Sequence, residues 1–93
     1  GDTFPSGTSG QTLRHNGSDW VADSNLYNDG TNIGIGTTTP NSKLEVSGGD
    51  ISLVSNQKYN FEGSSGDSYM KYDPSNNYIS VFVNGVEVAR FKN

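Results

Sequence analysis

Residues 78–91 read YISVFVNGVEVARF, two runs of alternating β-branched and aromatic residues on either side of Asn84-Gly85. Asn-Gly readily takes the two positive-φ positions of a type I′ turn, so this stretch predicts a β-hairpin. In a hairpin with that loop, the residue three before the Asn faces the residue four after it. Val81 then faces Val88, and Glu87 points to the opposite side.

Both faces of this predicted hairpin are largely apolar, which is more than a lone hairpin can bury. We therefore expect it to pack against more of the chain on one side and against another subunit on the other. One face carries Ile79, Val81, Val83, Val86 and Val88, and the other carries Tyr78, Phe82, Ala89 and Phe91.

The same turn signature occurs twice upstream, at Asn16-Gly17 and at Asp29-Gly30. The spacing rule places apolar residues opposite each other in both hairpins and sets Arg14 against Asp19. A third hairpin, turning at Gly48-Gly49, follows from the alternation in residues 43–53. The predicted cross-strand pairs are Leu13 with Trp20, Leu26 with Ile33, Val46 with Ile51, and Leu44 with Leu53.

The rest of the chain divides readily. Residues 1–10 are rich in Gly, Ser and Thr and predict a linker. Residues 11–56 predict a module of hairpins, in which the alternation of Gly and Ile in 33–36 indicates close backbone approach or a bend. Residues 57–93 predict a C-terminal β-meander. Since no window has helical periodicity, the fold class is all-β.

Composition favours an oligomer. Gly, Ser, Asn and Thr make up nearly half of the 93 residues, and only 30% are hydrophobic. So short and polar a chain buries too little apolar surface to offset its conformational entropy alone. Without cysteine and with one histidine, disulfides and structural zinc do not supply the deficit, which leaves oligomerisation.

Charge and motifs exclude several function classes. The net charge is −4 and the six basic residues are scattered, unlike a nucleic-acid-binding surface. No apolar run is long enough to insert into a membrane. Residues 23–30 lack the spacing of a calcium loop, and His15 has no catalytic partners. We predict no enzymatic activity, cofactor or metal.

Two stretches resemble the repeated module of bacteriophage tail-fibre and related surface-fibre proteins. The first is GQTLRHNGSDWV, residues 10–21, and the second is LYNDGTNIGIGTTTPNSKLEV, residues 26–46. This resemblance implies an elongated parallel homotrimer that forms part of a fibre in a virion or on a bacterial surface. It also implies neighbouring fibre or virion proteins as partners and a role in host attachment. Fibres of this kind often end in a self-cleaving chaperone domain, of which this chain shows no trace.

We therefore predict a structural fibre component. The alternatives are an adhesin stalk of the bacterial surface and a carbohydrate-binding tip, whose exposed aromatic residues would bind a host-surface glycan. A stalk should place its aromatic residues, Trp20 included, at subunit contacts. The expected trimer core or interface residues are Leu13, Trp20, Leu26, Ile33, Leu44, Val46, Ile51, Leu53, Val81 and Val88.

Overall fold

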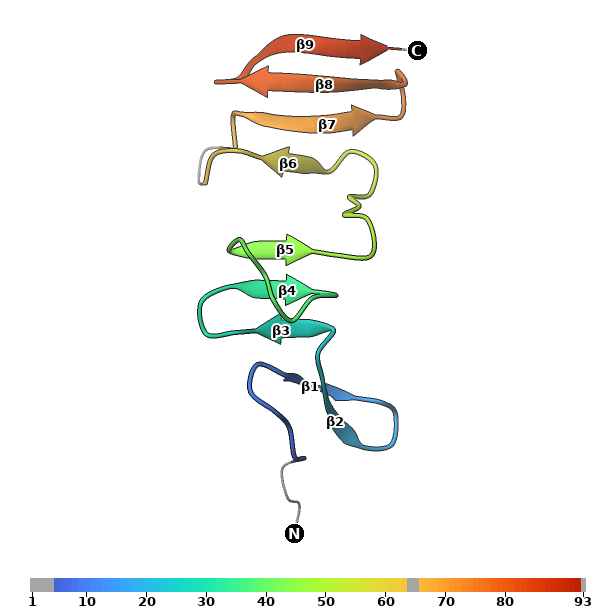
Figure 1. The fold of residues 1–93 in the computed structure, drawn as a ribbon. Coiled ribbons are helices and arrows are strands. Elements are labelled where there is room, and N and C mark those ends of the chain that lie inside the picture. Colours follow the sequence, from blue (N-terminus) through green and yellow to red (C-terminus); the bar gives the residue numbers. More distant parts are fainter. Residues whose placement is uncertain (1–4, 64–65, 93) are drawn as a thin grey trace. The chain divides into compact units, whose positions relative to one another are not determined.

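The computed structural model describes residues 5–63 and 66–92, which hold nine strands and no helix. The all-β prediction is thus confirmed for this part of the chain. The strands are β1 (Thr12–His15), β2 (Trp20–Asp23), β3 (Leu26–Asn28), β4 (Ile33–Ile35), β5 (Leu44–Val46), β6 (Lys58–Asn60), β7 (Tyr69–Asp73), β8 (Tyr78–Val83) and β9 (Val86–Lys92) (Figure 1).

The chain folds as two compact units, Gly1–Ile51 and Ser52–Asn93. The first unit contains the hairpin β1-β2 and the three-stranded sheet β3-β4-β5, and the second contains the four-stranded sheet β6-β7-β8-β9. Of the linker predicted over residues 1–10, residues 1–4 lie outside the described part. Its last residue is built into the first unit, because the carbonyl of Gly10 accepts a hydrogen bond from the Asn28 N–H at 2.8 Å.

The β1-β2 hairpin differs from the predicted register by two residues. Leu13 pairs with Ala22, and His15 pairs with Trp20, so the predicted pair of Leu13 with Trp20 is wrong. The central residues of the turn are Gly17 and the serine that follows it, and only the glycine has a positive φ, 103°. Positive φ at the first central residue is typical of a type II′ turn.

A side chain explains this shift. The Asn16 side-chain oxygen accepts the N–H groups of Ser18 and Asp19, each at 2.8 Å. Asn16 thereby stays directly after the end of β1, where its own N–H donates to the Asp19 carbonyl at 2.9 Å. With Asp19 in the turn, Arg14 instead forms an ion pair with Asp23 at 3.0 Å, which corrects its predicted partner.

The next hairpin, β3-β4, contains the same kind of turn. Asp29 accepts hydrogen bonds from the N–H groups of Thr31 and Asn32, and Gly30 has a φ of 95°. Leu26 consequently pairs with Ile35 instead of the predicted Ile33. In both hairpins the slip is two residues, so every side chain keeps its predicted face.

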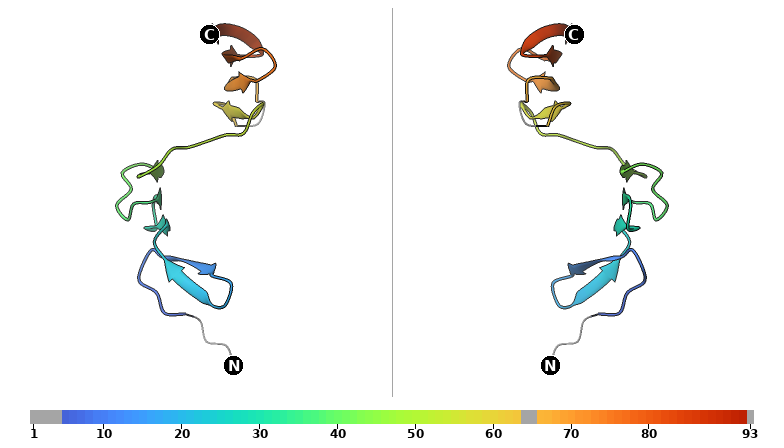
Figure 2. Two further views of the ribbon diagram at one scale, coloured as in Figure 1. Left: turned by 90° about the vertical axis from the view of Figure 1, so that its right-hand side faces the viewer. Right: turned by 90° about the vertical axis from the view of Figure 1, so that its left-hand side faces the viewer.

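Strand β5 does not form the predicted hairpin around Gly48-Gly49. It pairs in parallel with β4, with Leu44 beside Ile33 and Val46 beside Ile35. The predicted pairs of Val46 with Ile51 and of Leu44 with Leu53 are therefore wrong, and both downstream residues lie outside any strand. Residues 36–43 make the return on one side of the sheet (Figure 2).

Two glycines make this return possible. Gly36 has a φ of 81°, and a Cβ on it would collide with the carbonyl oxygen of Ser47. A Cβ on Gly34 would collide with the carbonyl oxygen of Thr37. Only glycine permits backbones to approach so closely, which confirms the close approach predicted from the Gly-Ile alternation.

Strands β6 to β9 are antiparallel and follow one another in chain order, which makes them a meander. The turn between β8 and β9 has positive φ at both central residues, 52° at Asn84 and 79° at Gly85, as a type I′ turn requires.

Beyond that turn, β9 contains a bulge. Phe82 pairs with Glu87, but Val81 pairs with Ala89 in place of the predicted Val88. The extra residue shifts the alternation of everything after it. Ala89 and Phe91 therefore join the face of Val81, and Arg90 moves to the opposite one, which corrects the faces predicted for this strand.

We expect the substitution Gly85→Val to destabilise the second unit by more than about 1 kcal/mol, because a β-branched residue is strained at positive φ. Gly49→Val is the matched control, since Gly49 has no positive φ and open space around its Cβ position. Chemical denaturation of both variants measures the difference. Equal midpoints would contradict the assigned turn.

Candidate assembly surfaces

The sheet β6-β9 has one face made almost entirely of apolar side chains. Cross-strand pairing places Met70 beside Val81 and Tyr72 beside Ile79, and the bulge adds Phe91 beside Ile79. Phe61, just after β6, continues this face, and its ring packs at 5.1 Å from that of Tyr59. The face consists of Tyr59, Phe61, Met70, Tyr72, Ile79, Val81, Val83, Val86, Ala89 and Phe91.

Most of these side chains are exposed to solvent. Phe91 is 65% exposed and Val86 63% exposed. In the described residues no hydrophobic side chain is buried anywhere, so a single chain has no apolar core. Exposed apolar patches of this kind mark interaction sites in soluble proteins.

The opposite face of the same sheet carries charged and aromatic groups that cover one another. The rings of Tyr69 and Phe82 stack at 4.7 Å, and the Lys58 ammonium lies 4.2 Å above Tyr69. The Arg90 guanidinium lies 4.2 Å from the ring of Tyr78. These cation–π contacts occupy ring faces that a sugar would otherwise use for stacking.

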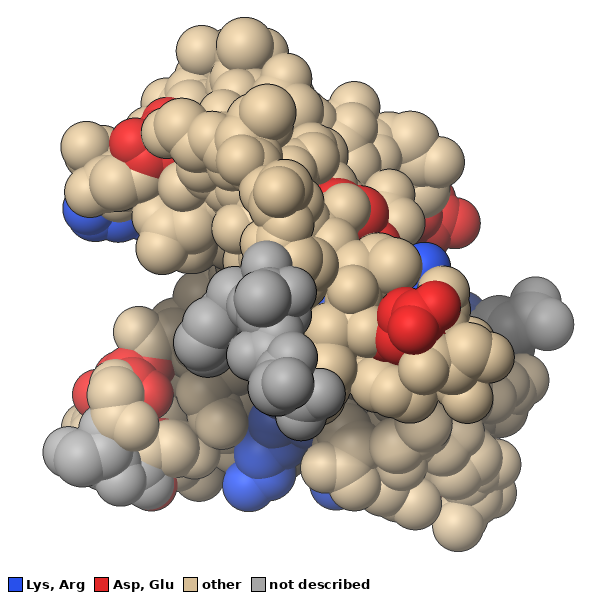
Figure 3. Space-filling model, turned by 90° about the horizontal axis from the view of Figure 1, so that it is seen from below, with Lys and Arg blue, Asp and Glu red and all other residues tan. Residues whose placement is uncertain are grey.

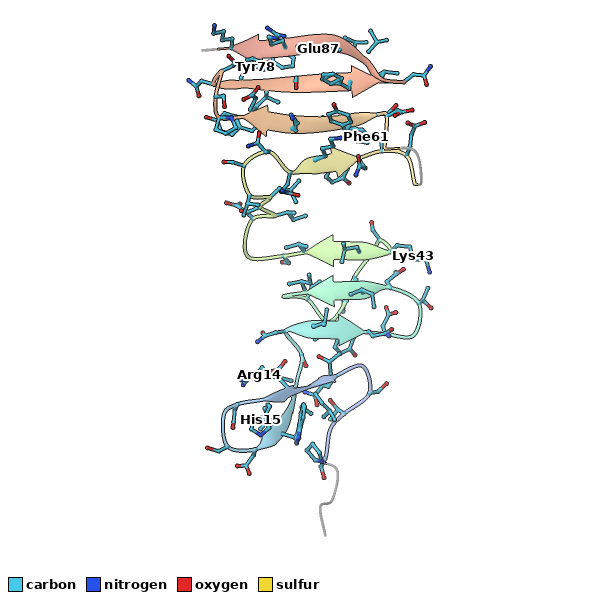
Figure 4. The ribbon with its side chains drawn as sticks, turned by 180° about the vertical axis from the view of Figure 1, so that it is seen from behind. Arg14, His15, Lys43, Phe61, Tyr78 and Glu87 are labelled. Atoms are coloured by element: carbon cyan, nitrogen blue, oxygen red, sulfur yellow. The ribbon has the colours of Figure 1, made fainter. Side chains whose placement is uncertain are left out.

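Arg90 also holds Glu87 in an ion pair at 2.6 Å, which lowers the pKa of that carboxyl and raises the pKa of the guanidinium (Figure 4). Beneath this layer Ser80, between Lys71 and Arg90 in the ladder, is only 2% exposed. Side chains of the chain itself therefore cover the sheet on its charged face, which we call the closed side.

The sheet β3-β4-β5 has the same two-sided character. Residues 36–43 cover its polar face, where Pro40 is buried and Glu45 accepts the Asn41 N–H at 2.7 Å. The ring of Tyr27 lies against Gly10 on that side. The other face is apolar and open, and it carries Leu26, Ile33, Ile35, Leu44 and Val46.

The β1-β2 hairpin places Leu13, His15, Trp20 and Ala22 on one face. Trp20 is 59% exposed, and His15 meets its ring edge-on at a centroid distance of 5.2 Å. Arg14 and Asp23 lie on the other face, and their ion pair lowers the pKa of Asp23.

The predicted interface residues fall on the three sheets, except for two that lie outside the strands. Leu13 and Trp20 share a face of the first hairpin, and Leu26, Ile33, Leu44 and Val46 share a face of the second sheet. Val81 lies on the apolar face of the third sheet and Val88 at its bulge, whereas Ile51 and Leu53 are exposed outside the strands. Sequence reasoning missed the members Ile35, Met70 and Phe91. One signal of the register shift is present in the sequence. Arg90 occupies the position that would continue the apolar alternation of Val86 and Val88.

Within residues 5–63 and 66–92, no group of His, Cys, Asp or Glu side chains is arranged to hold a metal ion. No helix long and apolar enough to cross a membrane occurs in the same residues. Most of the surface visible in Figure 3 belongs to uncharged residues.

Comparison of the chain with protein-family models, with curated proteins and with solved structures finds no match. The resemblance of residues 10–21 and 26–46 to fibre modules therefore stays an expectation.

The Asp29 turn should respond to acid. Hydrogen bonds from the N–H groups of Asn32 and Thr31 hold the pKa of Asp29 below its ordinary value. A pKa that is lower in the folded state gives stability that is present above about pH 3.9 and is lost as the pH falls through the folded value. We expect the amide resonances of both donors to titrate in that window.

Asp29→Asn is the matched control, because Asn16 fills the equivalent position in the first hairpin. In this variant the two resonances should stay flat. A wild-type protein whose two amides do not titrate, or an Asn variant that titrates like wild type, would contradict the turn.

Proposed function

We propose that this chain is a structural component of a trimeric phage-type tail or surface fibre that supports host attachment. The observation that carries the proposal is that each sheet has an exposed apolar face, while no aliphatic or aromatic hydrophobic side chain in the described residues is buried. Such a chain needs identical or similar faces from other subunits to complete its core.

Identical copies suit this face. The charged residues of β6-β9 project from the closed side, so the apolar faces of several copies meet without bringing like charges together. Each large side chain that becomes fully buried contributes about 1.5–3 kcal/mol.

A trimer is the form that the fibre resemblance implies. Three single-layer sheets related by a threefold axis enclose a shared interior, and cyclic symmetry makes the three chains parallel. Neighbouring fibre or virion proteins would then continue the assembly at its ends. On this proposal the protein is located in a virion, and a bacterial surface is the alternative.

Sedimentation equilibrium tests the assembly. We expect wild type to have three times the chain mass. Val81→Asp should remain monomeric, because it places an unpaired charge on the apolar face. Glu87→Gln alters the opposite face and should assemble like wild type. A folded wild-type monomer at micromolar concentration, or equal assembly of both variants, would refute the proposal.

A carbohydrate-binding tip is the second candidate, favoured by the exposure of Trp20. If Trp20 lies at a subunit contact instead, Trp20→Ala should cost about 3–5 kcal/mol of trimer stability, as the loss of a buried aromatic does. Thermal melting and a glycan array separate the two functions. Glycan binding that disappears in a Trp20→Ala protein of normal melting temperature would establish the tip.

A further inference from the structure

In the turn between β1 and β2, hydrogen bonds engage both the side-chain oxygen of Asn16 and the backbone N–H of the residue that follows it. The backbone N–H of Gly17 donates to the Nδ1 atom of His15 at 3.1 Å. The Asn16 Oδ1 atom accepts the N–H groups of Ser18 and Asp19, each at 2.8 Å. All of these residues are exposed, so water reaches the turn freely.

These contacts match the needs of one reaction, the closure of an asparagine side chain onto the next backbone nitrogen. The nitrogen must lose its proton, and the side-chain oxygen must take up negative charge. His15 Nδ1 lies at that proton as a base, and the two N–H donors lie at that oxygen. Gly17 has no side chain to shield its nitrogen.

We propose that Asn16 is a self-modification site, which converts to aspartate and isoaspartate in the folded protein. A bond forms between the Gly17 nitrogen and Asn16 Cγ, and the bond from Cγ to Nδ2 breaks. The proton from Gly17 passes to His15 Nδ1 and then to Nδ2, which leaves as ammonia. Water then opens the cyclic imide at either carbonyl, giving aspartate or isoaspartate with no change of oxidation state.

The other Asn-Gly and Asp-Gly pairs lack this base. The Gly85 N–H donates to the carbonyl oxygen of Asp67 at 2.9 Å, and the Gly30 N–H donates to the side-chain oxygen of Asn28 at 2.9 Å. Neither oxygen accepts a proton at neutral pH. Asn84 is therefore an internal reference for Asn16 in the same molecule.

The product alters the hairpin that generates it. Aspartate at position 16 adds a negative charge close to Asp19. Isoaspartate inserts an additional backbone carbon, so the main chain no longer fits the β1-β2 ladder. Because hydrolysis of the amide is irreversible, the modified fraction records how long the folded protein has existed.

The test follows both asparagines during incubation of the full chain at neutral pH, by peptide mapping with mass spectrometry and by ammonia release. We expect Asn16 to convert at least about a hundredfold faster than Asn84, the lower end of what a positioned base supplies. In protein unfolded by urea the two rates should become similar, because folding creates the difference.

Two variants isolate the base. His15→Phe removes the acceptor, and His15→Asn keeps an acceptor of the kind that Asn28 provides but cannot take the proton. Both should slow the conversion of Asn16 toward the rate of Asn84. In the His15→Asn variant the NMR chemical shift of the Gly17 amide proton should still be that of a hydrogen-bonded amide. Equal rates at Asn16 and Asn84 in the folded protein would overturn the proposal. So would wild-type rates in the folded His15→Asn protein, which decides the question if the Phe variant does not fold.

Discussion

The structure depends on a difference between the two sides of each sheet. One side is covered by the chain's own groups: residues 36–43 on β3-β4-β5, and cation–π and ion-pair contacts on β6-β9. The other side carries apolar side chains that nothing in the described chain covers. Burial of apolar surface is the main favourable term in folding, so this chain is left with most of that term unused.

Residue types that are close together in the sequence made much of the fold predictable. The places of three hairpins, the absence of helices in the described residues and the faces of Leu13, Trp20 and Leu26 follow from dipeptides and alternation. Register was harder, because it depends on side chains. Asn16 and Asp29 satisfy turn N–H groups with their side-chain oxygens and so remain at the strand ends, whereas Asn84 enters the turn at positive φ. The same dipeptide signature thus gives two registers.

Long-range pairing was not predictable from the same signals. Strand β5 alternates like a hairpin arm, yet it returns in parallel to β4 through a connection shorter than the dozen or so residues that parallel pairs usually need. That route requires backbone contacts at Gly34 and Gly36, and the Gly-Ile alternation indicates a close approach there without indicating which segment makes it. The sequence therefore indicated which residues share the open face of this sheet without indicating which strands adjoin.

The bulge in β9 has a consequence for how this chain tolerates insertions and deletions. Because the residues after Val88 are one step out of phase with those before the turn, the polar and apolar sides of β9 are kept apart by chain length as well as by residue type. Closing the bulge without removing a residue would bring Arg90 opposite Ile79 and send Phe91 to the charged side, whereas deleting Val88 would leave the pairs of Ala89, Arg90 and Phe91 unchanged. In this strand the bulge, and not the alternation of residue types alone, decides which side chains reach the apolar face.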